Sequence, residues 1–380
     1  MAVGVSASRL VGRDRQLAEL EGALADAAGG RPSLAFVAGE SGVGKTRLVG
    51  ELQGRAAERG VRVLSGDCVE LGEGQLAYAP LVMAMRPLVR ESDPVLDAVP
   101  APARAELAAL LPGLGDGGPR DRRDDQARVF EALLAVLEGL ARSAPVLLVI
   151  EDLHWADPST RAFLRFLAAA LADEAILVVA TYRPDELHRR HPLRPLLAEL
   201  ERSQRALRVE LPRLARDELA DQLADLLGAP PGDDLVERLY ARSEGNPLYT
   251  EELLAAGADG RGRLPASLAA AFAMRIERLG DDAQEVVRVL SAAGAVEHEV
   301  LAEVVGLDPR ALNDALREAV STHIVVTGAG DRYTFRHALL REAVHDELLP
   351  GERAELHRAL AAALERRGLL RFAEPDRTSS

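Results

Sequence analysis

The feature that most constrains the fold is a glycine-rich stretch of eight residues, Gly39-Glu40-Ser41-Gly42-Val43-Gly44-Lys45-Thr46. It fits the pattern G-x-x-x-x-G-K-[ST] at every fixed position. Residues 34–38 in front of it form an apolar run typical of a buried parallel strand, and residues 46–59 behind it carry apolar side chains at helical spacing. The order strand, glycine loop, helix predicts a parallel α/β sheet with this loop at its edge.

The residue types of this loop suit the binding of phosphate groups. Its glycines let backbone N–H groups turn inward around phosphate oxygens, and the following helix adds the partial positive charge of its N-terminus. Lys45 would reach the β- and γ-phosphates of a nucleotide, and the Thr46 hydroxyl would ligate Mg²⁺. We therefore expect ATP or ADP with Mg²⁺ to be held by seven loop residues: Gly39, Ser41, Gly42, Val43, Gly44, Lys45 and Thr46.

Lys45 also stands out in the composition, because it is the only lysine among the 46 lysine and arginine residues. Lysine binds phosphate as a compact point charge, whereas arginine offers a broad planar fork. A need for a compact positive charge at this position explains why a sequence whose other basic residues are all arginine has a lysine here.

A second apolar run, residues 145–150, leads straight into two carboxylates, Glu151 and Asp152. After such a strand, one acid would hold Mg²⁺, directly or through water, and the next would orient or deprotonate the attacking water. The first acid here is Glu rather than the usual Asp, and its extra methylene shifts the carboxylate. Both Glu151 and Asp152 are therefore candidates for the metal role and for the catalytic role.

A third strand, residues 175–180, is followed directly by Thr181-Tyr182-Arg183-Pro184. Ligands of open parallel sheets bind at the carboxyl edge of the strands. Arg183 is therefore a candidate catalytic residue that senses the γ-phosphate, and the alternative is an ordinary surface arginine at a strand end. Before this strand, Asp157-Pro158 predicts an N-cap and the start of a helix over 159–171.

Two further stretches accompany the loop and the acidic strand: Leu10-Val11-Gly12-Arg13-Asp14 and Glu244-Gly245-Asn246-Pro247-Leu248. Together with residues 151–158 they resemble the ATPase module of STAND-class signalling ATPases, an AAA-like group. The module most similar is that of bacterial LuxR-type large ATP-binding regulators, and the resemblance extends from Leu10 to about Arg341. It implies that Val11 and Gly12 lie against the adenine and that Pro247 closes the other side of the base. Composition alone predicts only a turn at 245–247, between helices at 235–242 and 248–256.

The segment Arg336-His337-Ala338 opens a predicted helix with apolar positions on one face. It resembles in part the Met-His-Asp stretch of STAND relatives such as plant resistance proteins. In those relatives the histidine contacts the β-phosphate of ADP and keeps the protein inactive. The resemblance implies the same contact for His337, although Arg336 and Ala338 replace the flanking Met and Asp. The alternative is a histidine packed at a helix start without a ligand.

The order of strand and helix patterns divides the chain into four expected parts. Residues 1–211, with one more strand at 62–64, predict a three-layer P-loop nucleotide-binding domain. Residues 212–257 predict a small helical lid, followed by a linker at 258–262. Residues 264–349 combine helices with a hairpin signature at 324–335, which predicts a winged-helix-like domain. Residues 350–380 predict a terminal helix at 352–366 and a disordered tail from 375.

One connection inside the first expected domain differs from the others. Residues 113–125 are rich in glycine and charge and predict a mobile loop, followed by a helix at 126–140.

Charge and composition exclude several classes of partner. The formal net charge is −14, which opposes binding to phosphate backbones and anionic membranes. Between residues 265 and 348 there are 14 acidic residues against 8 arginines, so the winged-helix-like region lacks the basic surface that DNA binding requires. The chain has one cysteine, no N-terminal leader pattern and no apolar run of the ~18 residues that cross a bilayer. We expect a cytoplasmic protein without membrane or nucleic-acid contacts.

Three functions are compatible with these patterns. The first is a nucleotide-driven regulatory switch with slow ATP hydrolysis, in which exchange of ADP for ATP opens the lid and permits self-association. The second is a plain ATPase that performs mechanical or chemical work, for which the sequence offers no substrate site. The third is a regulator that binds DNA through its winged helix, which the charge opposes. The helical repeats and helix-turn-helix of LuxR-type regulators are absent from these 380 residues, so a fragment and a shortened relative are both open.

Overall fold

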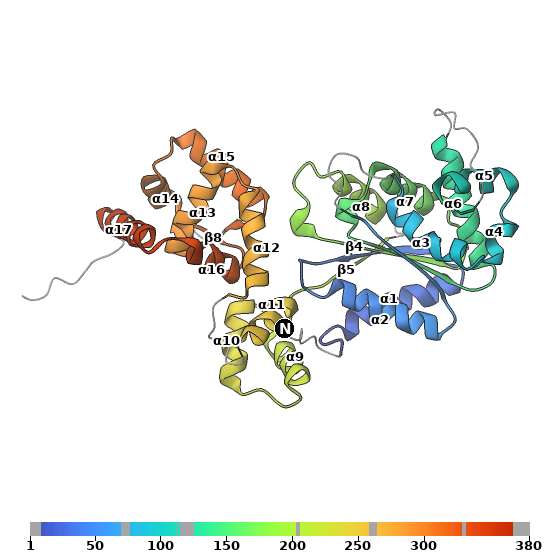
Figure 1. Cartoon of the computed structure of the whole chain (residues 1–380), viewed down its shortest axis with the longest axis horizontal. Helices are drawn as coiled ribbons and strands as arrows, with labels where there is room; N and C mark the ends of the chain where they lie inside the picture. The colour runs from blue at the N-terminus through green and yellow to red at the C-terminus, as the bar shows by residue number, and fades with distance from the viewer. Residues whose placement is uncertain are drawn as a thin grey trace, which may run out of the picture. The chain divides into compact units, whose positions relative to one another are not determined.

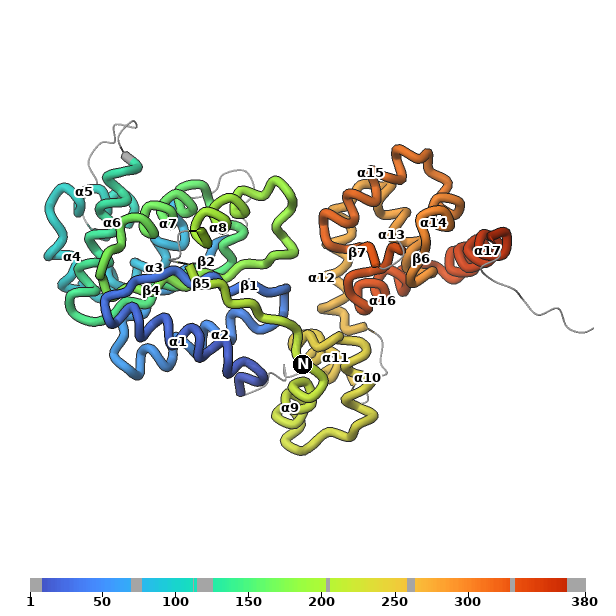
Figure 2. The backbone as a smooth tube through the Cα atoms, turned by 180° about the vertical axis from the view of Figure 1, so that it is seen from behind, coloured from blue at the N-terminus to red at the C-terminus, as the bar shows by residue number. Residues whose placement is uncertain are grey.

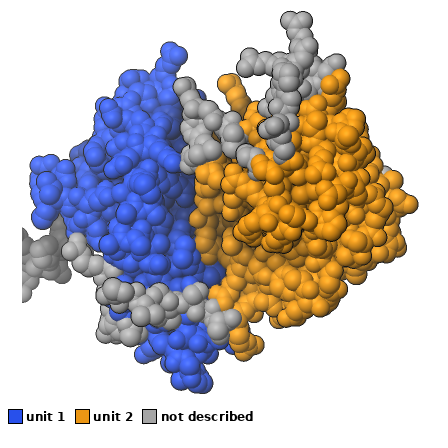
Figure 3. All heavy atoms as spheres, turned by 45° about the vertical axis from the view of Figure 1, so that its right-hand side comes forward, with its two compact units in different colours: residues 1–7, 215–380 blue, residues 8–214 orange. Residues whose placement is uncertain are grey.

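The computed structural model describes residues 9–69, 77–111, 113–114, 125–202, 206–257, 264–328 and 332–367. The described chain forms two compact units that divide between residues 214 and 215 (Figure 3). In chain order, the first is residues 8–214, orange and labelled unit 2 in Figure 3, and the second begins at residue 215 and is blue, labelled unit 1. This division lies a few residues after the predicted boundary at 211/212. The predicted linker at 258–262, the predicted tail from 375 and most of the predicted loop at 113–125 lie outside the described residues.

The first unit is built on a five-stranded sheet in the order β2-β3-β4-β1-β5, and every adjacent pair of strands is parallel. The strands are β1 (Ser33–Ala38), β2 (Arg62–Asp67), β3 (Val146–Glu151), β4 (Ile176–Tyr182) and β5 (Ala206–Glu210). The first four confirm the strands predicted from apolar runs. The edge strand β5 was not predicted, because its sequence Ala-Leu-Arg-Val-Glu mixes apolar and charged residues.

Helices cover both faces of this sheet and make three layers (Figures 1 and 2). Successive strand side chains point to opposite faces. On β1, Ala35 and Val37 pack toward α1 (Asp14–Ala28) and α2 (Lys45–Glu58), whereas Leu34 and Phe36 pack into the opposite core. That second core is covered by six helices: α3 (Ala79–Arg90), α4 (Pro94–Ala98), α5 (Ala101–Leu110), α6 (Asp125–Ala141), α7 (Pro158–Ala170) and α8 (Leu193–Arg202). The predicted α/β class is confirmed.

The strand register brings three predicted segments to one edge of the sheet. Ala38 at the end of β1 lies opposite Tyr182 of β4, and Ile150 of β3 lies opposite Ala180. The loop after β1, the acids that end β3 and the residues that follow β4 therefore share the carboxyl edge. This is the edge where open parallel sheets bind ligands.

The second unit begins with three helices, α9 (Arg216–Leu227), α10 (Asp233–Ser243) and α11 (Pro247–Ala256), where the sequence predicted a lid. Asn246 is the N-cap of α11, since its side chain accepts hydrogen bonds from the N–H groups of Leu248 and Tyr249. Proline suits the first helical position because it has no N–H to leave unsatisfied there. The Gly-Asn-Pro stretch is therefore the turn that the sequence indicated.

The rest of the second unit combines helices with a small antiparallel sheet of order β6-β8-β7. Its helices are α12 (Ala266–Glu277), α13 (Asp281–Ala293), α14 (His298–Val305), α15 (Pro309–Ser321), α16 (Ala338–Glu347) and α17 (Pro350–Arg366). The predicted hairpin is present as β7 (Val325–Thr327) and β8 (Arg332–Phe335), with Val325 opposite Phe335. The third strand, β6 (Ala295–Glu297), was too short to show a period in the sequence. No helix within the described ranges combines the length and the apolar character needed to span a membrane.

Candidate functional site

The loop between β1 and α2 needs glycine at three positions for steric reasons. Gly42 and Gly44 have φ values of 76° and 101°, which side chains rarely adopt, and Gly44 is the N-cap of α2. A Cβ on Gly39 would lie 2.7 Å from Cγ1 of Val43 and 3.2 Å from Cβ of Leu211. The three glycines therefore allow a tight loop whose end leads directly into the N-terminus of a helix.

Lys45 is the first residue of α2, and its side chain is 7% exposed. Its Nζ donates hydrogen bonds to the carbonyl oxygens of Gly39, at 2.8 Å, and Glu40, at 2.9 Å. Within the described parts of the chain it forms no ion pair with a carboxylate. Burial, followed by the charge of Arg183, lowers the pKa of Lys45 from 10.5 to about 8. A buried ammonium without a counter-charge at a helix N-terminus is a site that an anion would complete.

Thr46 and Glu151 meet across this site, although 105 residues separate them in sequence. The Thr46 hydroxyl donates a hydrogen bond of 2.6 Å to Oε2 of Glu151. Burial raises the pKa of Glu151 despite that hydrogen bond and the nearby charge of Lys45. A hydroxyl and a carboxylate are oxygen ligands of the type that Mg²⁺ uses. No cluster of three metal-ligating side chains occurs in the described ranges, so a metal ion here would draw further oxygens from phosphates and water.

Asp152, the next residue, makes a different set of contacts. It has a left-handed φ of 52°, and its N–H donates a 3.0 Å hydrogen bond to Oγ1 of the fully buried Thr181 at the end of β4. Its carboxylate oxygen Oδ1 lies 3.6 Å from Nε of Arg183 and 3.9 Å from Nδ1 of His154. The two acids thus have different neighbours: a hydroxyl for Glu151, and an arginine and a histidine for Asp152.

Arg183 is held on further sides by side chains from the same unit. Its Nη1 donates a 2.6 Å hydrogen bond to Oε1 of Glu186, and its Cζ lies 5.0 Å from the centre of the Trp155 ring. The ring of His154 packs against Trp155 with centroids 4.6 Å apart. The predicted alternative, a solvated surface arginine, does not describe this side chain, which is 22% exposed.

The segment around Val11 and Gly12 is tied to the loop by the next residue, Arg13. The Arg13 guanidinium is 3% exposed, and its Nη2 donates to the carbonyl oxygens of Val43, at 3.2 Å, and Pro212, at 2.6 Å. One buried arginine therefore joins the N-terminal segment, the glycine loop and the chain that follows β5. The left-handed φ of Gly12, 64°, lets the chain turn into this contact.

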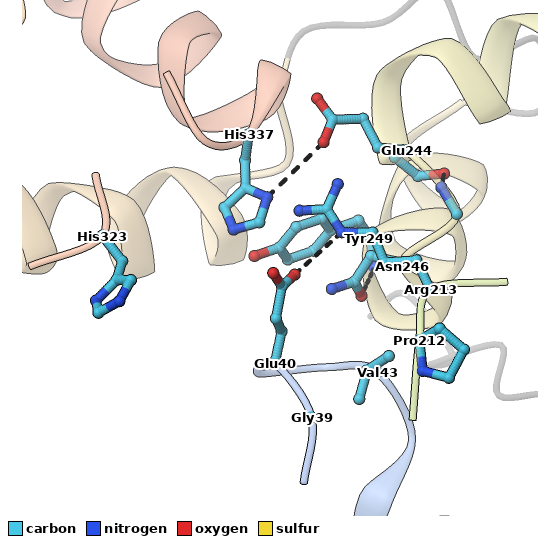
Figure 4. A network of polar contacts seen from close by, with 12 residues as sticks. Gly39, Glu40, Val43, Pro212, Arg213, Glu244, Asn246, Tyr249, His323 and His337 are labelled. Atoms are coloured by element: carbon cyan, nitrogen blue, oxygen red, sulfur yellow. Dashed lines mark hydrogen bonds and ion pairs between the residues drawn. The ribbon is translucent and has the colours of Figure 1, made fainter. Parts of the chain in front are cut away.

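A second contact links the glycine loop to the chain that follows β5. Nε of Arg213 lies 3.0 Å from Oε2 of Glu40 in a partly buried ion pair (Figure 4). Glu40 is also the residue whose carbonyl oxygen accepts from Lys45.

The remaining predicted site residues, Pro247 and His337, belong to the second unit. The Pro247 carbonyl accepts a 3.1 Å hydrogen bond from Nε2 of the buried Gln222. His337 is the N-cap of α16 and is 3% exposed, with Nδ1 3.8 Å from Oε2 of Glu244 (Figure 4). Contacts of Pro247 and His337 with a nucleotide on the first unit stay predictions.

The carboxyl edge of the sheet thus gathers most of the residues that the sequence singled out: the loop from Gly39 to Thr46, Glu151, Asp152 and Arg183. The sequence interpretation gave no site role to Arg13, Thr181, Glu186 or His154. Arg13 stood next to Gly12 in a quoted motif, and Thr181 and Glu186 flank Arg183, so position along the chain was a usable signal. Nothing in the sequence indicated that Arg213 pairs with Glu40.

Comparison with solved structures gives low overall similarity. A STAND protein with a tetratricopeptide repeat sensor from Pyrococcus horikoshii is 15% identical with a TM-score of 0.38, covering 96% of this chain and 47% of that one. A RuvB variant from Thermotoga maritima is 16% identical with a TM-score of 0.41, covering 85% of this chain and 92% of that one.

Comparison of sequences is more informative. An uncharacterised protein of Rhizobium meliloti (strain 1021) is 27% identical over 413 aligned positions, which cover 97% of this chain and 38% of the relative. The chain therefore spans well under half the length of this relative. Residues 9–179 match the family model described as AAA ATPase domain.

Loop, acidic strand and sheet order together define the class: the first unit is a P-loop ATPase module. Its residues 9–179 are similar to AAA ATPase domains.

Proposed function

We propose that this chain binds ATP and ADP with Mg²⁺ and acts as a nucleotide-dependent regulatory switch of the STAND type, with slow ATP hydrolysis. The observation that carries the nucleotide site is Lys45, a buried ammonium at a helix N-terminus whose partners among the described residues are two carbonyl oxygens and no carboxylate. An anionic phosphate supplies the missing counter-charge.

Each residue at the carboxyl edge has a role in this proposal. Lys45 and the loop N–H groups bind the β- and γ-phosphates, and Thr46 with Glu151 holds Mg²⁺. Mg²⁺ bound there supplies positive charge against the charge that develops on the transferred phosphate. Asp152 orients the attacking water, because its carboxylate lies beside Arg183, whereas Glu151 is the acid bonded to Thr46. Arg183 senses the γ-phosphate.

The switch part of the proposal concerns the second unit. Val11, Gly12 and Pro247 would enclose the adenine, and His337 would contact the β-phosphate of ADP. The lid and the winged-helix-like region are linked: Glu244 after α10 accepts a 2.8 Å hydrogen bond from the N–H of Ala338 at the start of α16. Oε1 of Glu342 on α16 also lies 2.6 Å from Nη2 of Arg242 on α10. These contacts support a lid that moves together with the winged-helix-like region, and this coupling would control self-association.

The experiment has two steps. The nucleotide that copurifies with the chain is identified, and size-exclusion profiles are then compared with ADP and with a non-hydrolysable ATP analogue. We expect bound ADP and a larger assembly only with the ATP analogue. Lys45→Ala serves as the control, since it removes a phosphate-binding charge but little packing, and calorimetry should detect no tight ATP binding.

The two steps separate the two parts of the proposal. Unchanged ATP affinity in Lys45→Ala would rule out the phosphate-binding role of the loop. Normal ATP binding and rapid turnover, without any change in assembly, would instead favour a plain ATPase.

A further inference from the structure

Glu186 has no role in the nucleotide site described so far, yet it is built into it. A short 3₁₀ turn, η2 (Pro184–Glu186), follows β4 and folds the Glu186 carboxylate back onto Arg183. Oε1 accepts the 2.6 Å hydrogen bond from Arg183, and Oε2 lies 3.2 Å from Nε2 of His154. Burial raises the pKa of Glu186, but contact with His154 and Arg183 outweighs it and lowers the pKa to about 2. Glu186 therefore carries a full negative charge at neutral pH.

His154 gives this carboxylate a fixed position. Its side chain is 1% exposed, and its ring packs against Trp155. Trp155 in turn lies beneath the Arg183 guanidinium. Glu186, whose side chain is 33% exposed, is thus held between a buried histidine and the arginine, and these two contacts restrict its movement.

Arg183 retains hydrogen-bonding capacity in this arrangement. A guanidinium has five N–H donors, and among the described residues its one hydrogen-bond acceptor is Glu186. Nε is buried without a hydrogen-bond partner and lies 3.6 Å from Oδ1 of Asp152. Glu186 and Trp155 therefore fix one end and one face of the guanidinium, while other donors remain for an acceptor beside Asp152.

We propose that Glu186, anchored by His154, is a positioning residue that orients Arg183 and thereby sets the preference of the site for ATP over ADP. This inference rests on the proposed nucleotide-binding function. A free arginine side chain loses rotamer entropy when it is fixed by a ligand. Glu186 fixes Arg183 before the nucleotide arrives, so the γ-phosphate of ATP meets an oriented donor. ADP has no γ-phosphate and gains nothing from this arrangement.

The test is calorimetric titration of ATP analogue and of ADP into the full chain and its variants. Glu186→Ala should lower the ratio of ATP to ADP affinity about tenfold, with ADP affinity unchanged. Glu186→Gln keeps the shape but removes the charge, so it should lower the same ratio by about threefold. If Glu186→Ala does not fold, the ratio of ATP to ADP affinity in Glu186→Gln tests the inference by itself. Glu199→Ala, which removes an exposed partner of Arg165 in the same unit, is the matched control and should leave the ratio unchanged.

A double-mutant cycle distinguishes positioning from general support of the fold. In an Arg183→Ala background, Glu186→Ala should cause no further loss of ATP preference, because its effect passes through the arginine. Equal losses of ATP and ADP affinity, or additive losses in the double variant, would overturn the inference while the nucleotide-binding function stands. Failure of the parent chain to bind either nucleotide would instead refute the proposed function itself.

Discussion

Lys45 is the residue whose ionisation leads to the most specific prediction. Its pKa of about 8 reflects burial first and the charge of Arg183 second. Because the folded-state pKa lies below the ordinary value of 10.5, the unfolded chain holds this proton more tightly than the folded one. Burying the charged lysine costs stability below about pH 8. The free energy of unfolding therefore rises as pH increases from about 8 to 10.5, where this cost is relieved. Bound phosphates would raise the pKa of Lys45 again, because they stabilise its charged form.

The pH dependence of nucleotide binding follows from this linkage. ATP affinity should fall roughly tenfold between about pH 7 and about pH 9, because the empty site loses the lysine proton that binding requires. Calorimetry in buffers of different ionisation enthalpy should show proton uptake on binding near the upper end of this range. Lys45→Arg is the control, since a guanidinium stays charged and should flatten the profile. A flat profile in the parent chain would contradict the prediction.

The two acids at the end of β3 should separate binding from hydrolysis. Asp152→Asn should retain ATP binding and lose turnover, because its carboxylate faces Arg183 and His154 rather than Thr46. Glu151→Gln should weaken Mg²⁺-dependent ATP binding. Paired measurements of ATP affinity with and without Mg²⁺, and of phosphate release, test both. If Asp152→Asn abolishes binding together with turnover, the roles of the two acids are exchanged.

At the scale of elements, the N-terminus of α16 concentrates contacts within the second unit. The Glu244 carboxylate accepts a hydrogen bond from the first N–H of the helix and lies 3.8 Å from His337 Nδ1. The Tyr249 ring lies 6.2 Å from the His337 ring in an edge-to-face arrangement (Figure 4). Residues at the end of α10 and in α11 are therefore joined to the start of α16 at His337.

Replacing that histidine should shift the switch if His337 stabilises the ADP-bound form. His337→Ala should release ADP faster and assemble more readily with ATP, because a contact made only in one state shifts the population when it is removed. Stopped-flow release of fluorescent ADP and size-exclusion profiles measure the two effects. His345→Ala, on the same helix, is the matched control. Identical kinetics and assembly for His337→Ala and its parent would leave His337 with a packing role alone.

At the scale of the whole molecule, net charge opposes nucleic-acid binding. The chain carries 60 acidic and 46 basic residues, and the region 265–348 is acidic as well. We predict no sequence-specific DNA binding by these 380 residues at physiological salt, because too few cations are present to displace counterions. Footprinting and salt-dependent retention on DNA test this, and a protected site would contradict it.

The strand–loop–helix unit around Lys45 and the acids after β3 could be predicted because their signals are local. A glycine loop between an apolar run and a helical period needs only neighbouring residues to be recognised. The same holds for the N-cap at Asp157, which the structure bears out. The short strands β5 and β6 carried no such local signal.

Sequence alone therefore determined the chemistry at the sheet edge: a phosphate-binding loop, two acids and an arginine, each placed at the end of a strand. Tertiary structure alone decided the order β2-β3-β4-β1-β5 and which side chains restrain these groups. Arg13 reaches Pro212 across 199 residues, and Glu186 meets the buried His154. Such contacts form only after distant segments have packed against one another. Because hydrophobic packing is non-directional, a local sequence pattern does not indicate which segments will meet.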